Sequence, residues 1–324
     1  MFGYIRILHT DGSDRQRNHR RIFSLVLAFW AIFGAAASLA AQTGAGAATG
    51  TGAGKAVSAV DSLGRTIVLK SAAQRVVSLT PTATEILFAV GAGGQTVGAT
   101  KFCNYPAEAF ALPKVGGFSG ATVSAEQIVA LKPDLVLVSG GMHGKIIGLL
   151  NSLGVTNFAL EPTTFSQVYD NILAVGTLTG RTAEAEKTVQ SMKSRIAAVV
   201  KLKEGKPRPG VFWELWDDPL MTAGGSTFLS EAIGLAGGRN IFADMSEQWP
   251  TVGLEQILVR KPEWIIAGDD HGDRANLTVV SKRPGWGAVP AVRNGQISTI
   301  DSDIITRAGP RLADAVEALA SILK

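Results

Sequence analysis

The chain has 324 residues, of which 46% are hydrophobic and only 18% are charged, so it can bury a large core and does not have the composition of a disordered protein. Its net charge of +4 is unevenly distributed, because residues 1–40 hold five Arg against two Asp and the rest of the chain carries only +1. This distribution leaves no basic surface for nucleic acid, and we expect no nucleic-acid partner.

The first 40 residues have the pattern of a signal peptide. A basic segment at 15–21 precedes an uncharged apolar run from Ile22 to Ala37, and small residues follow up to Ala40. A run of about 16 residues is short of the roughly 20 that span a bilayer, so we expect cleavage near Ala40 and export to the periplasm rather than a retained anchor. The single cysteine, Cys103, does not follow the apolar run and allows no disulfide within the chain.

Beyond a low-complexity Gly/Ala/Thr linker at 41–56, strands and helices alternate. The first helix is predicted from Thr82 to Val90, with Thr82 and Glu85 forming a capping box. A helix capped by Ser124 follows. The other predicted elements of this half are strands at 76–79, 135–139 and 155–160 and helices at 145–153 and 165–178. Such alternation is typical of parallel sheets covered by helices.

Residues 182–203 predict one uninterrupted helix of about 30 Å, because they lack Gly and Pro and repeat apolar side chains at helical spacing. A second alternating series begins at Val211 and ends in a helix at 311–323. We therefore predict an α/β fold of two doubly wound (Rossmann-like) lobes joined by one long rigid helix, with a ligand cleft between the lobes. The predicted parts are a signal peptide (1–40), a linker (41–56), an N-terminal lobe (57–180), a linking helix (181–206) and a C-terminal lobe (207–324).

An internal repeat supports the two-lobed prediction. Residues 122–138 align with residues 251–267 without a gap, at a constant offset of 129 residues. Thr, Val, Glu, Gln, Ile, Lys and Pro coincide between the two segments. Shared helix–turn–strand periodicity alone does not require seven identities at one offset, so the repeat indicates two related halves.

Six stretches together resemble the periplasmic binding proteins that serve the importers of vitamin B12, haem and ferric siderophores. They are Arg75–Glu85, Asn104–Pro106, Leu112–Gly117, the Glu-Gln-Ile…Lys-Pro repeat, Gln248–Val252 and Arg307–Arg311. Within this family the sequence is most similar to the cobalamin-binding members, through Trp-Pro before the second repeat and Ser-Asp-x-x-x-Arg-Ala-x-Pro-Arg near the end. The resemblance implies a monomer that binds a cobalamin-type corrinoid without any cofactor and delivers it to the membrane subunits of an ABC importer.

A corrinoid is large and flat and carries amides around its rim, so its cleft needs aromatic faces and a few polar groups. The loops after the strands supply them. The candidate ligand-binding residues are Phe102, Tyr105 and Phe118 in the first lobe and Trp216, Met221, Trp249, Asp303 and Arg307 in the second. By resemblance, all but Tyr105 and Trp216 fall at positions that line the cleft of the family, and Asp303 is expected to pair with Arg307. Any of these aromatics could instead belong to the core, as we expect for Trp213.

The repeat places matched acids, Glu126 and Glu255, in the first turn of two helices, where a carboxylate also stabilises the helix dipole. By resemblance, these two positions meet arginines of the importer's membrane subunits. The sequence departs from the family after the strand at 135–139, where Ser139-Gly140-Gly141 replaces a Trp of the cobalamin-binding members. His143 follows and could face a metal centre, although a solvent-exposed His is the expectation we favour.

Three alternatives stay open from the sequence. Haem or a ferric siderophore could be the ligand, because Tyr105 lies where haem-binding relatives have an axial tyrosine. A bare-metal carrier is disfavoured, since only His143 and His271 follow the leader, and we predict no metal site. An enzyme on a two-lobed scaffold is also disfavoured, because Gly117–Gly120 lacks the closing Gly of a nucleophile elbow and we found no phosphate-binding loop.

Overall fold

The computed structural model describes residues 55–269 and 277–324. The predicted signal peptide and most of the predicted linker therefore lie outside the described residues. Within the two described ranges, no helix is both long enough and apolar enough to cross a membrane.

The N-terminal lobe is built on a parallel four-stranded sheet in the order β4-β3-β5-β6. Its strands are short and fully apolar in the centre, as in β5, where every side chain is buried. In chain order the lobe contains β3 (Val76–Ser78), α1 (Pro81–Ala89), β4 (Thr96–Ala99), α2 (Ala125–Ala130), β5 (Leu135–Val138), α3 (Gly144–Ser152), β6 (Asn157–Ala159) and α4 (Phe165–Thr179).

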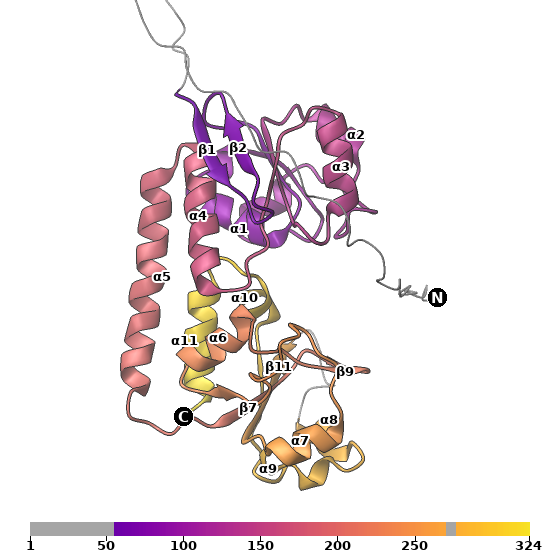
Figure 1. Cartoon of the computed structure of the whole chain (residues 1–324), viewed down its shortest axis with the longest axis vertical. Coiled ribbons are helices and arrows are strands. Elements are labelled where there is room, and N and C mark those ends of the chain that lie inside the picture. Colours follow the sequence, from indigo (N-terminus) through magenta and orange to yellow (C-terminus); the bar gives the residue numbers. More distant parts are fainter. Residues whose placement is uncertain (1–54, 270–276) are drawn as a thin grey trace, which may run out of the picture. The chain divides into compact units, whose positions relative to one another are not determined.

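A two-stranded antiparallel hairpin precedes this sheet and contacts α4, and the sequence analysis did not predict it (Figure 1). It pairs β1 (Val57–Val60) with β2 (Thr66–Leu69). Its turn is held by Asp61, whose carboxylate accepts the backbone N–H of Leu63 at 3.0 Å and of Arg65 at 2.9 Å. Burial, the largest single influence, acts to raise the pKa of Asp61, but the Arg65 guanidinium and the backbone N–H groups of Arg65 and Ala159 together hold that pKa below its ordinary value.

The C-terminal lobe repeats the same plan with a parallel sheet in the order β10-β7-β11-β12. A small antiparallel pair, β8 and β9, projects after its first strand. In chain order the lobe contains β7 (Gly210–Glu214), β8 (Trp216–Asp217), β9 (Leu220–Met221), α6 (Phe228–Leu235), β10 (Arg239–Asn240), α7 (Leu254–Arg260), β11 (Trp264–Gly268), α8 (Leu277–Lys282), α9 (Pro290–Arg293), β12 (Ile297–Ile300), α10 (Ser302–Thr306) and α11 (Leu312–Ile322). The predicted α/β fold with two doubly wound lobes is confirmed.

The structure confirms the internal repeat down to the backbone. The repeated segments form the helix–strand pairs α2–β5 and α7–β11, and β5 and β11 hold the same place in the two strand orders. After each helix, one lysine adopts a left-handed conformation, with φ of 47° at Lys132 and 48° at Lys261. These lysines are themselves 129 residues apart, so the duplication includes a turn with positive φ, a backbone conformation that residues other than Gly rarely adopt.

The long helix α5 spans Thr182–Lys203, as predicted, and it packs against α4 of the first lobe and α11 of the second (Figure 1). One hydrophobic cluster runs from Ile86 and Phe165 through Met192 of α5 to Val211 and Leu312. Because this cluster crosses from one lobe to the other, moving the lobes apart would expose apolar surface, which favours a stiff connection.

The predicted capping box of α1 is wrong. Thr80, not Thr82, caps the helix by accepting the backbone N–H of Ala83 at 3.1 Å, and Pro81 occupies the first helical position, for which its fixed φ is suited. The Glu85 side chain is buried and binds two arginines of the other lobe instead of the helix end. A residue that matches a local motif is thus used for a contact between lobes.

Candidate ligand-binding cleft

A cavity of about 610 Å³ lies between the two lobes, where the carboxyl ends of both parallel sheets supply its walls. Loops of the first lobe contribute Phe102, Phe118 and Glu161 to the lining. The second lobe contributes Phe228 and the helix α10 region. The cavity has the size of sites that hold drug-sized ligands, and it is not closed off from solvent.

Two aromatic rings form the wall on the first lobe. Phe102 and Phe118 pack edge to face, with ring centroids 5.7 Å apart at an angle of 76°. They remain 44% and 47% exposed, although rings of this size usually bury most of their surface. The Lys101 ammonium lies 5.3 Å from the centre of the Phe102 ring, a favourable position for a cation over a π-system. The wall therefore offers apolar surface that a bound molecule could cover.

The prediction that His143 is exposed to solvent is wrong, because its side chain is fully buried behind this wall. Its Nδ1 accepts the backbone N–H of Ser139 at 2.9 Å, so the proton resides on Nε2, which donates to the carbonyl oxygen of Phe118 at 3.1 Å. Burial lowers the pKa of His143, while the contact with Phe118 and the charge of Glu161 oppose that shift. The imidazole thus ties the Phe118 loop to the end of β5.

On the second lobe Phe228 lines the cavity, and the half-buried Trp249 packs against it outside the lining, with ring centroids 6.5 Å apart. Trp249 lies in a loop that is hydrogen-bonded to the neighbouring backbone, since the N–H of Gly224 donates to the Gln248 carbonyl at 2.8 Å. A Cβ on Gly224 would lie 1.9 Å from the Glu247 carbonyl oxygen. Only glycine permits this close approach of the two backbone segments, and the contact fixes the position of the loop that carries Trp249.

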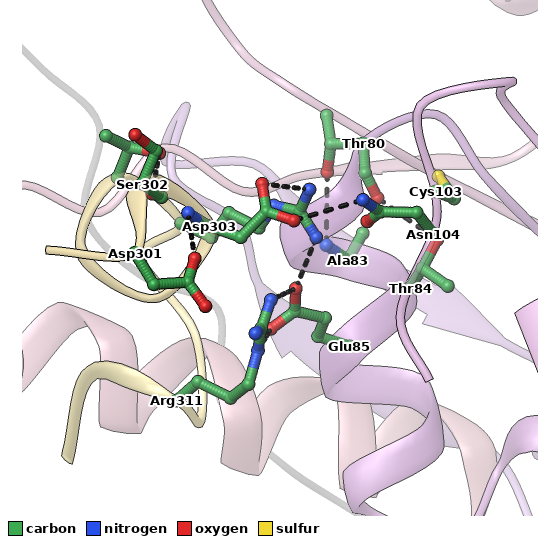
Figure 2. Close-up of polar contacts among 12 residues, drawn as sticks. Thr80, Ala83, Thr84, Glu85, Cys103, Asn104, Asp301, Ser302, Asp303 and Arg311 are labelled. Carbon is green, nitrogen blue, oxygen red and sulfur yellow. Dashed lines mark hydrogen bonds and ion pairs between the residues drawn. The ribbon is translucent and has the colours of Figure 1, made fainter. Parts of the chain in front are cut away.

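An ionic network joins the lobes at the floor of the cleft (Figure 2). Arg307 donates to Asp303 at 2.5 Å, which confirms the predicted pair, and to Glu85 of α1 at 2.8 Å. Arg311 donates to both oxygens of Glu85, at 2.9 and 2.6 Å. Asn104 of the first lobe completes the network by donating to Asp303 at 3.0 Å. Two carboxylates and two guanidinium groups thus balance in charge where the lobes meet.

Tyr105 lies outside this cavity. Its ring packs under the Arg311 guanidinium at 4.1 Å and lines a separate groove formed with α1, α5 and the start of α11. Hydrogen bonds to Glu85 are the main cause of the raised pKa of Arg311, so the cation over the ring keeps its charge. Asn104, the residue before Tyr105, lines the cavity in its place.

Trp216 and Met221 face each other on the β8–β9 hairpin and do not line the cavity as it stands. The indole N–H of Trp216 donates to the Asp218 carbonyl at 2.8 Å, and its ring is 43% exposed. Trp213, by contrast, is buried in the core, as predicted. Of the eight predicted ligand-binding residues, the structure brings Phe102, Phe118, Asp303 and Arg307 together around the cavity, with Trp249 adjacent to it.

A family model described as periplasmic binding protein matches residues 76–304, which include both four-stranded sheets and the whole of α5. The chain belongs to the periplasmic binding protein family. Members of this family bind solutes and are not enzymes, which excludes the catalytic alternative considered from the sequence.

Individual relatives differ in what their names say about the ligand. The chain is 33% identical over 268 residues to an uncharacterised ABC transporter substrate-binding lipoprotein, YvrC, of Bacillus subtilis, covering 80% of this chain and 83% of the relative. It is 32% identical over 253 residues to the vitamin B12-binding protein of Photorhabdus laumondii, covering 78% and 88%. The solved structure of the periplasmic heme-binding protein BhuT with two hemes matches with a TM-score of 0.69 and 26% identity, covering 77% and 97%.

Two acidic residues of this family member stand away from the cleft. Glu126 and Glu255 are exposed in the first turns of α2 and α7, where the repeat predicted them. Neither forms an ion pair within 4.0 Å with any residue that the structure describes. Both carboxylates are therefore exposed and unpaired within the described part of the chain.

Most of the residues that line the cavity were missed by the sequence analysis, among them Lys101, Asn104, Glu161 and Phe228. The first three follow β4 or β6 of the first sheet, so their position after a strand could have identified them. Phe228 is buried at the start of α6 and has no such signal. Over residues 55–269 and 277–324, no group of three or more His, Cys, Asp or Glu side chains is placed to hold a metal ion.

Proposed function

We propose that this chain captures a cobalamin-type corrinoid outside the inner membrane and delivers it to the membrane subunits of an ABC importer. The observation that carries the proposal is the aromatic lining of one cavity from both lobes, with Phe102 and Phe118 on one lobe and Phe228, against which Trp249 packs, on the other. A flat ring with two apolar faces is the ligand shape that such a lining favours.

The polar groups of the cavity suit the rim of a corrinoid. The corrin ring carries amides, each of which both donates and accepts hydrogen bonds, and Asn104, Asp303 and Arg307 offer groups of both kinds at the cleft floor. The vitamin B12-binding relative supports the same ligand class. Among ligands of this family, a corrinoid therefore fits both the apolar and the polar lining.

Haem is the second candidate, supported by the likeness to BhuT, and a ferric siderophore is the third. The placement of Tyr105 weighs against haem, because its ring packs under Arg311 in a different groove and no phenol lines the cavity among the residues that the structure describes. A haem iron bound in the cavity would then need an axial ligand from elsewhere.

Isothermal titration of the purified mature chain with cyanocobalamin, dicyanocobinamide and haemin tests the proposal. We expect both corrinoids to bind with a Kd of about 1 μM or tighter, and haemin to bind at least about tenfold more weakly. Phe118→Ala should weaken corrinoid binding about tenfold, whereas Phe110→Ala, which removes an exposed ring outside the cavity, should leave it unchanged. Tight haemin binding without corrinoid binding would contradict the proposal.

Delivery is proposed to use the matched carboxylates Glu126 and Glu255. Charge reversal of both, Glu126→Arg with Glu255→Arg, should leave corrinoid affinity intact and weaken binding to the importer, because rim charges mainly set orientation and association rate. Glu186→Arg on α5 is the matched control, since it also reverses an exposed acid. Complex formation that is equal in all three proteins would argue against this docking mode.

A further inference from the structure

Glu161 is a carboxylate of the cleft wall that neither the sequence analysis nor the proposed function uses. It follows β6 at the carboxyl edge of the first sheet and lines the cavity. Its Oε2 accepts the Ser139 hydroxyl at 2.6 Å and the Gly141 N–H at 3.3 Å, while its own N–H donates to the Ser62 hydroxyl at 2.9 Å. Backbone and side chain are thus both held in place.

The second oxygen of this carboxylate, Oε1, has no hydrogen-bond donor among the described residues. Lys101 and Arg307 line the same cavity, yet the described part of the chain forms no ion pair with Glu161 within 4.0 Å. Arg307 is already bound to Glu85 and Asp303. The cleft therefore presents one fixed, unpaired carboxylate oxygen to whatever occupies it.

The adjoining turn leaves room for a ligand group at this oxygen. Gly140 and Gly141 have no side chains, and a Cβ built on Gly141 would lie 3.8 Å from Oε1. A larger side chain at Gly141 would grow from the position next to the carboxylate. Glycine at position 141 therefore leaves the space beside Oε1 free of a side chain.

We propose that Glu161 determines ligand specificity by accepting a hydrogen bond from an amide N–H on the ligand rim and by repelling ligands whose rim carries carboxylates. The inference rests on the proposed function, because it requires a rimmed, flat ligand in this cleft. An ionised carboxylate only accepts hydrogen bonds, so it can bind an amide N–H, whereas facing a second carboxylate gives like-charge repulsion and an unmet acceptor. A polar group left unpaired in a binding site discriminates strongly between otherwise similar ligands.

Two corrinoids with the same ring and different rims provide the test. Dicyanocobinamide carries amides, and dicyanocobyrinic acid carries carboxylates in their place. At about pH 7.5, where the rim carboxylates are ionised, the native protein should bind dicyanocobinamide at least about tenfold more tightly than the acid. Glu161→Gln should lower the ratio of the two affinities, dicyanocobinamide over the acid, about tenfold. The substitution removes the negative charge and supplies an N–H donor for the carboxylates of the acid.

The Gln variant is chosen because its amide oxygen can still accept from Ser139 and Gly141, so the loop keeps its support. Its unfolding transition should coincide with that of the native protein, and Glu186→Gln, a change of the same chemistry on an exposed face of α5, should leave the affinity ratio unchanged. An unchanged ratio in Glu161→Gln, with dicyanocobinamide still bound, overturns the specificity role alone. Failure of the native protein to bind either corrinoid overturns both the proposed function and this inference.

Discussion

The two lobes share a scaffold and differ in how they hold their aromatic walls. Both contain the same strand order, and both repeat the left-handed lysine, Lys132 and Lys261. In the first lobe, Phe118 is tied down by a buried imidazole, whereas in the second lobe Trp249 is placed by backbone contacts that only Gly224 allows. Duplication therefore accounts for the frame, while the loops at the carboxyl edges were free to acquire separate chemistry.

We expect the largest loss of stability from a change in the ionic network of Glu85, Arg307 and Arg311, which joins the two lobes. Glu85→Ala removes the carboxylate that neutralises Arg307 and Arg311, and both arginines are mostly buried. Breaking a buried ion pair from one side costs about 3–5 kcal/mol, because the partner charge is left uncompensated. Urea unfolding should show a loss of that size.

Glu126→Ala is the matched control for this junction. It removes an exposed carboxylate that lacks an ion-pair partner in the described structure, so unfolding should change by less than about 0.5 kcal/mol. Equal urea-unfolding midpoints for Glu85→Ala and Glu126→Ala would mean that the ionic network does not hold the lobes together.

A second prediction tests how the second lobe holds its wall. Gly224→Ala should destabilise the protein by about 1–3 kcal/mol and weaken corrinoid binding, because the new Cβ forces the backbone next to Trp249 to move. Gly148→Ala in α3 is the control, since its Cβ would enter open space and alanine favours the helix. Corrinoid titration that does not distinguish Gly224→Ala from the native protein would remove the argument for a backbone-placed Trp249.

The first lobe should respond to pH through His143. Burial lowers its pKa below the ordinary value of 6.5, so the neutral form is favoured in the folded state. The stability that this group contributes is complete above about pH 6.5 and is lost as the pH falls through the lower pKa of the folded protein. The unfolding free energy lost through His143 is at most about 1.4 kcal/mol per pH unit, and solvent screening makes it smaller.

His143→Gln isolates this contribution, because Gln does not titrate and can still donate to the Phe118 carbonyl. Between pH 7.5 and 5, the unfolding free energy of the native protein should fall more steeply than that of the variant. Parallel curves would show that the folded protein does not hold His143 neutral.

The smallest expected effect compares the repeated turns directly. Lys132→Gly and Lys261→Gly should each stabilise the protein by less than about 1 kcal/mol, since glycine adopts positive φ without strain but loses more chain entropy on folding. Lys→Ala at either site keeps the strain and serves as the control. If the two Lys→Gly variants changed the unfolding free energy in opposite directions, the turns would be alike in geometry but not in energy.

Sequence patterns predicted the frame better than the site. The run without Gly or Pro at 182–203 predicted α5, and the repeat with an offset of 129 residues predicted the paired lobes. Both predictions depend only on local or periodic sequence information. Glu85 and His143 were misread, since the partners that bury them, such as Arg311 and the Phe118 carbonyl, come from other elements. Glu161 was missed for the same reason, because its role depends on a donor 22 residues away at Ser139.

The central claim is that a flat corrinoid lies between two unlike aromatic walls, and a crystal structure of the mature chain with dicyanocobinamide tests it most directly. We predict ring density between Phe118 and the Phe228–Trp249 pair, with a rim amide within hydrogen-bond distance of Glu161. Density in the groove between Tyr105 and α5 instead, with the cavity filled only by water, would contradict the account.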